Sequence, residues 1–103
     1  MTTDDPLLAA LADAAQRKQR ADRQIRLLLA YAREHVQPRP YRLADLAKAA
    51  GMSISGVRTA YTQADTEHAA RLTGGTRSRH LLAVITSLLI NEQNAPKRHG
   101  TAA

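Results

Sequence analysis

The sequence predicts an all-α protein, a small helical domain of about five helices. Alanine and leucine, which both favour helix, dominate the 103-residue chain. The β-branched residues never cluster into an alternating run, so no segment has the pattern of a strand. The only aromatic residues are three tyrosines, so we expect an aliphatic core. A chain of this length suits one domain with a modest core, to which an oligomer interface would add buried surface.

The first helix is expected to begin at Asp5-Pro6, because aspartate is a good N-cap and proline fits the first turn. A mostly polar stretch over 14–24 then separates two groups of apolar residues. The pattern allows either one long helix over about 6–36, or a short N-terminal helix that leads into a second one near Ala21. The apolar residues at helical spacing are Leu7, Leu8, Leu11, Ile25, Leu28, Leu29 and Ala32.

Two short helices joined by a tight corner are expected next. The sequence QPRP at 37–40 ends the preceding helix, because proline cannot donate to the helical hydrogen-bond ladder. Apolar residues at positions i, i+3, i+4 and i+7 predict a helix over 43–50. Gly51 closes it as a residue that can take a positive φ. Ser53 is the expected cap of the following helix, over 53–62.

A further helix is expected from about Asp65 to Leu72, with Asp65 or Thr66 as its cap and a stop at Gly74-Gly75.

The last helix is expected over 78–92, with Ser78 as its cap. The predicted organisation is then an N-terminal helical extension over 1–20, a helical domain over 21–93 and a flexible tail over 94–103. The wide apolar face of the last helix is assigned to a dimer contact or to the core of the monomer. It consists of Leu81, Leu82, Val84, Ile85, Leu88 and Leu89.

The charge of the chain is unevenly distributed. The net charge is +6, but residues 1–15 carry three aspartates and no cation. Residues 16–42 carry eight arginines and lysines against two acids, a net charge of +6. Such a block points to an anionic partner, and nucleic acid is the usual one. The alternative is that the charge only keeps a small protein in solution.

Several other classes of function are not expected. There is no cysteine, and the four histidines lack the spacing of metal ligands, so we expect neither a metal nor a cofactor. No arrangement typical of an enzyme is present. No secretory signal is visible, and the longest apolar stretch, over 81–90, is too short to span a bilayer. We therefore expect a cytoplasmic protein that does not bind membranes.

The two central short helices have the spacing of a helix-turn-helix. A small residue in the first helix allows a close crossing, a glycine makes the turn, and apolar residues anchor the second helix. Residues 43–62 resemble the helix-turn-helix of bacterial transcriptional regulators of the LacI type, and less specifically region 4 of sigma factors. The matching residues are Leu43, Asp45, Leu46, Ala47, Ala50, Gly51, Met52, Ser53 and Val57. Gly56 departs from the pattern, which commonly has threonine there, and the chain has no sugar-binding domain.

The resemblance implies that the second helix lies in the major groove of double-stranded DNA. Its reading face is then the side opposite Val57 and Ala60. Arg58 is the strongest candidate, because a guanidinium donates two hydrogen bonds to guanine O6 and N7. The alternative is a phosphate contact or a solvated side chain. The residues expected to contact bases are Ser53, Ile54, Ser55, Arg58, Thr59 and Thr62.

The DNA backbone is expected to be held by Arg39, Arg42 and Lys48, which would position the protein without reading sequence. Five more basic residues either extend this footprint or form the solvated face of the long helix. They are Arg17, Lys18, Arg20, Arg23 and Arg26.

One helix-turn-helix reads few bases, so a homodimer on a two-fold operator is expected. Either the last helix or the N-terminal leucines would supply the contact. Two alternatives to a dimeric repressor remain open. One is an interaction module or adaptor on RNA polymerase or another protein, and the other is a plasmid or phage protein that organises or partitions DNA.

Overall fold

The all-α prediction is confirmed by a computed structural model, which describes residues 5–75 and 81–91. Within these residues the chain forms five helices and no strand. The helices are α1 (Pro6–Glu34), α2 (Leu43–Ala50), α3 (Ile54–Ala60), α4 (Gln63–Leu72) and α5 (Leu82–Ile90).

Helix α1 is one continuous element of 29 residues, so the alternative with a break near Ala21 is wrong. The side chain of Asp5 caps it by accepting hydrogen bonds from the N–H groups of Leu7 and Leu8, at 2.8 and 3.2 Å. Its polar middle consists mostly of good helix formers, and charged side chains one turn apart pair with each other there. Arg17 lies 3.0 Å from Asp13, and Lys18 lies 3.3 Å from Asp22. Such pairs each stabilise an exposed helix slightly.

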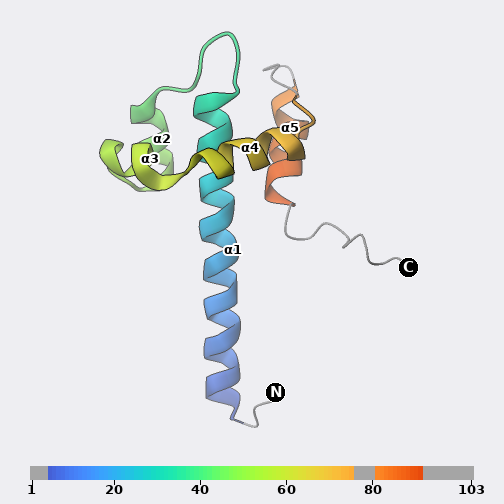
Figure 1. The fold of residues 1–103 in the computed structure, drawn as a ribbon. Coiled ribbons are helices and arrows are strands. Elements are labelled where there is room, and N and C mark those ends of the chain that lie inside the picture. The colour runs from blue at the N-terminus through green and yellow to red at the C-terminus, as the bar shows by residue number, and fades with distance from the viewer. Residues whose placement is uncertain (1–4, 76–80, 92–103) are drawn as a thin grey trace, which may run out of the picture.

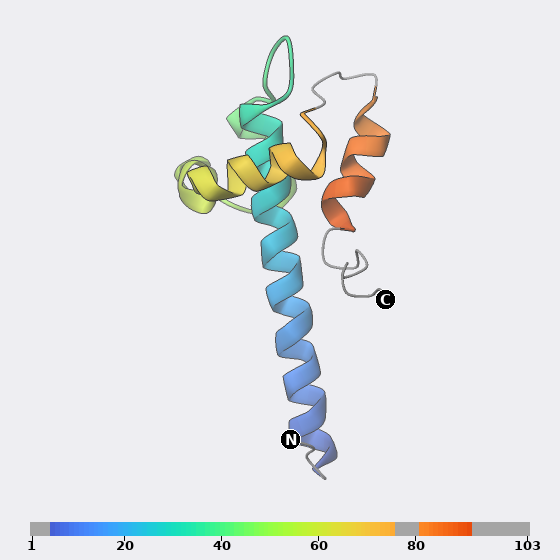
Figure 2. The same cartoon turned by 45° about the vertical axis from the view of Figure 1, so that its right-hand side comes forward.

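The other four helices surround the C-terminal half of α1 (Figure 1). In both views the N-terminal half extends away from them alone (Figure 2). Every residue from 5 to 22 is accordingly exposed. We call residues 6–22 the arm.

Three predicted helix ranges are wrong: α3 ends at Ala60 and not at residue 62, and α4 and α5 also have other bounds. Helix α4 begins at Gln63 and not at Asp65, because Thr62 and Asp65 form a reciprocal capping box. Asp65 thus belongs to the first turn of α4. Helix α5 runs over Leu82–Ile90, with Leu81 as its N-cap, and is shorter than the predicted 78–92. The predicted cap Ser78 and the predicted tail over 94–103 lie outside the described residues.

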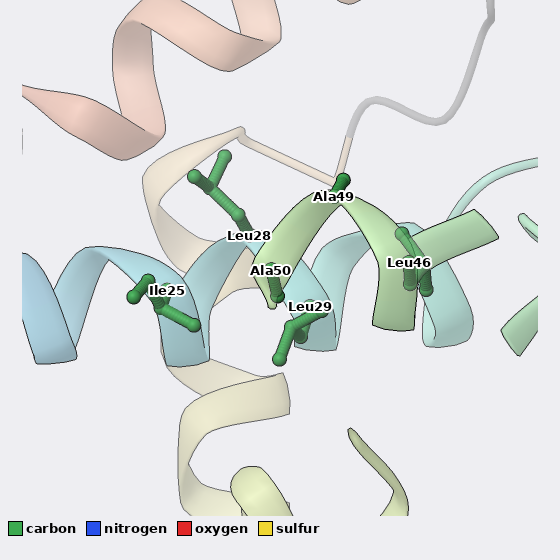
Figure 3. Close-up of a pocket in the computed structure, with 6 residues that line it drawn as sticks. All are labelled: Ile25, Leu28, Leu29, Leu46, Ala49 and Ala50. Atoms are coloured by element: carbon green, nitrogen blue, oxygen red, sulfur yellow. The ribbon is translucent and has the colours of Figure 1, made fainter. Parts of the chain in front are cut away.

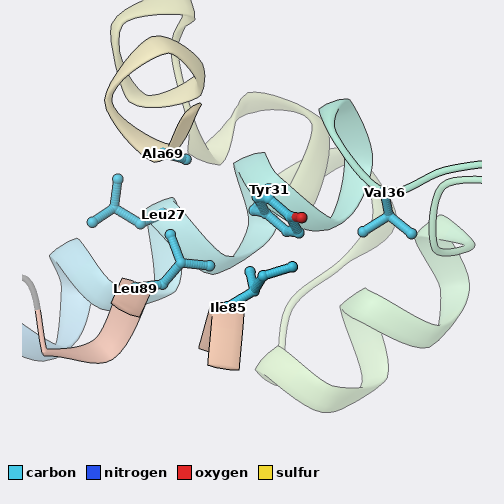
Figure 4. Close-up of a cluster of buried hydrophobic side chains, with 6 residues drawn as sticks. All are labelled: Leu27, Tyr31, Val36, Ala69, Ile85 and Leu89. Carbon is cyan, nitrogen blue, oxygen red and sulfur yellow. The ribbon is translucent and has the colours of Figure 1, made fainter. Parts of the chain in front are cut away.

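The larger of the two cores joins α1 to α4 and α5 (Figure 4). Its buried side chains are aliphatic apart from the ring of Tyr31, in agreement with the prediction. His35 is also buried, and its Nε2 donates a hydrogen bond to the carbonyl oxygen of Thr66 at 2.9 Å. The cluster consists of Leu27, Tyr31, Val36, Ala69, Ile85 and Leu89.

The smaller core joins α1 to the α2–α3 corner. Leu29, Ala47 and Val57 are buried in it, and Val57 is completely inaccessible. The half-buried side chains packed around them include Leu43, Leu46, Met52, Ala60 and Tyr61.

Candidate nucleic-acid interface

The corner between α2 and α3 is formed by three residues with local hydrogen bonds. Gly51 has φ 68° and ψ 36°, a left-handed conformation that glycine adopts without a steric penalty. The next N–H, of Met52, donates to the carbonyl oxygen of Ala47 at 2.9 Å. The hydroxyl of Ser53 accepts from the N–H of Gly56 at 2.9 Å and so caps α3, as predicted. The chain therefore turns from one helix to the next within Gly51, Met52 and Ser53.

Helix α3 has a buried side and an exposed side. Val57 is buried against Leu29 and Ala47, while Gly56 and Ala60 are half-buried beside it. The exposed side, together with the cap, consists of Ser53, Ile54, Ser55, Arg58 and Thr59. These are five of the six residues expected to contact bases, and the structure brings them together.

The side chains of the exposed side differ in how far their polar groups are already engaged. Thr59 donates its hydroxyl hydrogen to the carbonyl oxygens of Ser55 and Gly56, at 3.2 and 3.3 Å. The hydroxyls of Ser53 and Ser55 lie 3.4 Å apart. Among the residues that the structure describes, Arg58 pairs with no acidic side chain. Its five N–H donors are therefore available to a ligand.

Thr62, the sixth residue, lies outside α3. The helix ends at Ala60 and not at residue 62, because Tyr61 and Thr62 are both extended. The Thr62 hydroxyl accepts from the N–H of Asp65 at 3.3 Å, and the Thr62 N–H donates to the Asp65 carboxylate at 3.0 Å. Thr62 is thus the cap of α4.

Gly56 has no Cβ to crowd the side chain that caps α3. A Cβ at this position would lie 3.0 Å from the Ser53 hydroxyl oxygen and 3.5 Å from the end of the Met52 side chain. That oxygen is the acceptor of the N-cap hydrogen bond. Glycine therefore lets Ser53 cap α3 without a contact shorter than van der Waals distance.

The three residues expected to hold the DNA backbone lie on α2 or just before it. Arg39 is exposed on the connection from α1, Arg42 is the N-cap residue of α2, and Lys48 is in its last turn. Arg42 Nε lies 3.5 Å from the carboxylate of Asp45, but both side chains are mostly exposed, so this pair is weak. Arg39 and Arg42 line a shallow hollow together with Pro40, Tyr41 and Asp45.

Three of the basic residues on α1 lie within ion-pair distance of an acid in the described part of the chain. Arg17 and Lys18 pair within the arm, as described above. Arg26 lies 3.7 Å from Asp65, which ties α1 to α4. Arg20, Arg23 and Arg26 share one side of the helix, where they line a shallow polar hollow with Gln16 and Gln19. These pairings favour the reading of a solvated helix face for Arg17 and Lys18.

A link between α3 and α1 was not predicted from the sequence. The hydroxyl of Tyr61 donates to the carboxylate of Glu34 at 2.7 Å. Burial, together with the hydrogen bond and the negative charge of Glu34, raises the pKa of Tyr61 to about 12. The two residues are 27 positions apart, so no local spacing could indicate the contact.

The apolar face predicted for the last helix is divided between core and surface. Ile85 and Leu89 are buried and Leu82 is half-buried. The other three remain exposed, at 45% for Leu81, 58% for Val84 and 42% for Leu88.

No group of three or more histidine, aspartate and glutamate side chains within residues 5–75 and 81–91 is placed to hold a metal ion. In the same part of the chain, every helix is too short or too polar to cross a membrane. No protein-family model, curated protein or solved structure matches the chain.

Proposed function

We propose that the chain is a sequence-specific DNA-binding protein that reads the major groove of double-stranded DNA with α3 and acts as a dimeric transcriptional regulator. The observation that supports this most is the exposed side of α3. A short helix is held by Val57 on one side and carries five exposed residues on and beside the other. Arg58, which pairs with no acidic side chain in the described part of the chain, stands in the middle of that side.

Each residue of the exposed side has a role in this proposal. Arg58 donates two hydrogen bonds to one guanine, and Ile54 contacts the methyl group of a thymine. Ser55 donates a single hydrogen bond to a base or a phosphate, and Thr59, whose hydroxyl hydrogen is engaged within α3, accepts one from a base. Ser53 acts mainly as the cap, and Thr62 leaves the reading set because it caps α4.

The cations around α2 would supply affinity that does not depend on sequence. Arg39, Arg42 and Lys48 are all exposed near one end or the other of this helix. Contacts of this kind release counterions from DNA, so affinity falls steeply with salt concentration. Replacing Lys48 with alanine is expected to reduce the salt slope by about one, with little change in sequence preference.

The test is selection of bound duplexes from a random pool, followed by binding measurements on Arg58→Ala. The variant should bind the selected site roughly 5- to 150-fold more weakly and discriminate less at one base pair. Arg71→Ala is the matched control, because it removes the same charge from the last turn of α4. Equal binding by Arg58→Ala and the wild type would refute the assignment of α3 as the reading helix. A pool without any enriched sequence would refute sequence-specific binding.

A further inference from the structure

Along one side of the arm, helix α1 carries a stripe of leucines that no other described residue covers. Leu7, Leu8 and Leu11 are 75%, 54% and 63% exposed, although they are among the most apolar side chains of the chain. A solvated helix of this length is only marginally stable on its own in water. Burial of these leucines on a partner surface would therefore stabilise the arm.

A matching apolar groove lies at the other end of the same stripe (Figure 3). It has a volume of about 200 Å³ and lies between α1 and the C-terminal end of α2. Leu7 and Leu11 precede Ile25 and Leu29 by 18 residues, which is five turns of an α-helix at about 3.6 residues per turn. The arm leucines and the groove thus face the same side of α1. The groove is lined by Ile25, Leu28, Leu29, Leu46, Ala49 and Ala50.

We propose that two copies of the chain pair through antiparallel α1 helices, so that the arm leucines of each copy enter the groove of the other. The register that places Leu11 opposite Ile25 also places Leu7 opposite Leu29. Both pairs have their midpoint at residue 18. With a two-fold axis at Lys18, a single register therefore places the arm leucines of each copy opposite the groove of the other.

The charges at this axis are self-complementary. Lys18 and Asp22 already pair at 3.3 Å within one helix. The two Lys18 side chains meet at the axis, and each has an Asp22 about one helical turn away on either side, its own and that of the second copy, so the four charges sum to zero. The small residues Ala14, Ala15 and Ala21 beside them allow the helices to approach closely. A parallel pair would instead align the arms with each other and leave both grooves empty.

The antiparallel register also sets the distance between the two α2–α3 corners. Residue 29 of one copy lies opposite residue 7 of the other, and 22 residues at about 1.5 Å each separate the two units by about 33 Å along the helix axis. Half-sites one turn of DNA apart have centres about 34–36 Å apart. This agreement rests on the proposed function, whereas the pairing itself does not.

Cysteine cross-linking without DNA tests the pairing, because the native chain has no cysteine. Leu11→Cys and Ile25→Cys should each remain uncross-linked alone, while an equal mixture of the two should form a disulfide-linked dimer. Lys18→Cys should cross-link alone, because its two copies meet at the axis. Leu88→Cys, on the exposed side of α5, is the control.

The outcomes separate this proposal from its competitors. Cross-linking of Leu11→Cys alone would indicate parallel arms and overturn the proposal. Cross-linking of Leu88→Cys without the mixed dimer would assign the interface to α5, with the same consequence. A monomeric wild type in sedimentation equilibrium would also overturn it. If the proposed function were wrong and the pairing right, the mixed dimer would form but no DNA sequence would be selected.

Discussion

Replacing Gly56 with alanine tests whether the Ser53 cap explains this glycine. Alanine inside a helix is about 1 kcal/mol more favourable than glycine. A Cβ here, however, would lie 3.0 Å from the Ser53 hydroxyl oxygen, which accepts the capping hydrogen bond at 2.9 Å. Relieving this contact moves the hydroxyl away from its capping position, and loss of the whole cap would cost about 1 kcal/mol. The two terms cancel, so the free energy of unfolding of Gly56→Ala should stay close to that of the wild type.

A double-mutant cycle with Ser53→Ala isolates the conflict. Ser53→Ala alone should lower the free energy of unfolding by about 1 kcal/mol, because the cap is lost. In that background the nearest atom to the new Cβ is the end of the Met52 side chain at 3.5 Å, an ordinary contact. Gly56→Ala should then raise stability by about 1 kcal/mol, which gives a coupling of the same size. Urea denaturation followed by circular dichroism measures all four proteins. Additive effects, with Gly56→Ala stabilising equally in both backgrounds, would show that the cap does not require glycine.

Three further substitutions test other parts of the structure. Gly51→Ala should lower the free energy of unfolding by about 1 kcal/mol, because φ is 68° and no atom lies near the new Cβ. Gly51→Asn should cost less, and urea denaturation that reversed this order would contradict the left-handed turn. Since the pKa of Tyr61 is raised from 10.0 to about 12 in the fold, the protonated phenol is favoured there, and its contribution is lost as pH rises from 10 to 12. The free energy of unfolding should fall less steeply over this pH range in Tyr61→Phe than in the wild type, and identical slopes would exclude the contribution. Leu27→Ala, at a side chain 1% exposed in the larger core, should cost about 2–5 kcal/mol, whereas a loss no larger than that of Leu8→Ala in the arm would contradict its burial.

The features that the sequence predicted well are those with local causes. The start of α1 at Asp5, the turn at Gly51 and the cap at Ser53 each depend on hydrogen bonds within three or four residues. The start of α4 was misplaced for a local reason as well. Aspartate is favoured both as an N-cap and in the first turn, and only the reciprocal bonds with Thr62 show which position Asp65 holds.

The features that the sequence did not predict depend on contacts between distant parts of the chain. Tyr61 meets Glu34 across 27 positions, and His35 meets Thr66 across 31. Neither separation along the sequence is a helical or strand spacing from which the contact could be predicted. Which residues of the apolar face of α5 are buried also depends on contacts with a distant part of the chain. Only packing against α1 determines that Ile85 is covered and Val84 is not.

The length of the arm provides a test that joins the pairing to the function. A second copy of residues 14–20, inserted after residue 20, adds two helical turns, so the arm leucines return nearly to the same side of α1. The antiparallel pair should still form, with its two α2–α3 corners about 10 Å further apart, since each added residue contributes about 1.5 Å. The variant with the longer arm should then bind the site selected by the wild type more weakly, because a half-site moved out by about three base pairs, at 3.4 Å each, would lie about 100° further around the DNA. One inserted alanine is the control, because it turns the leucines by about 100° away from the groove and should abolish the dimer. Unchanged affinity for this site with the longer arm would show that α1 does not set the distance between the reading helices.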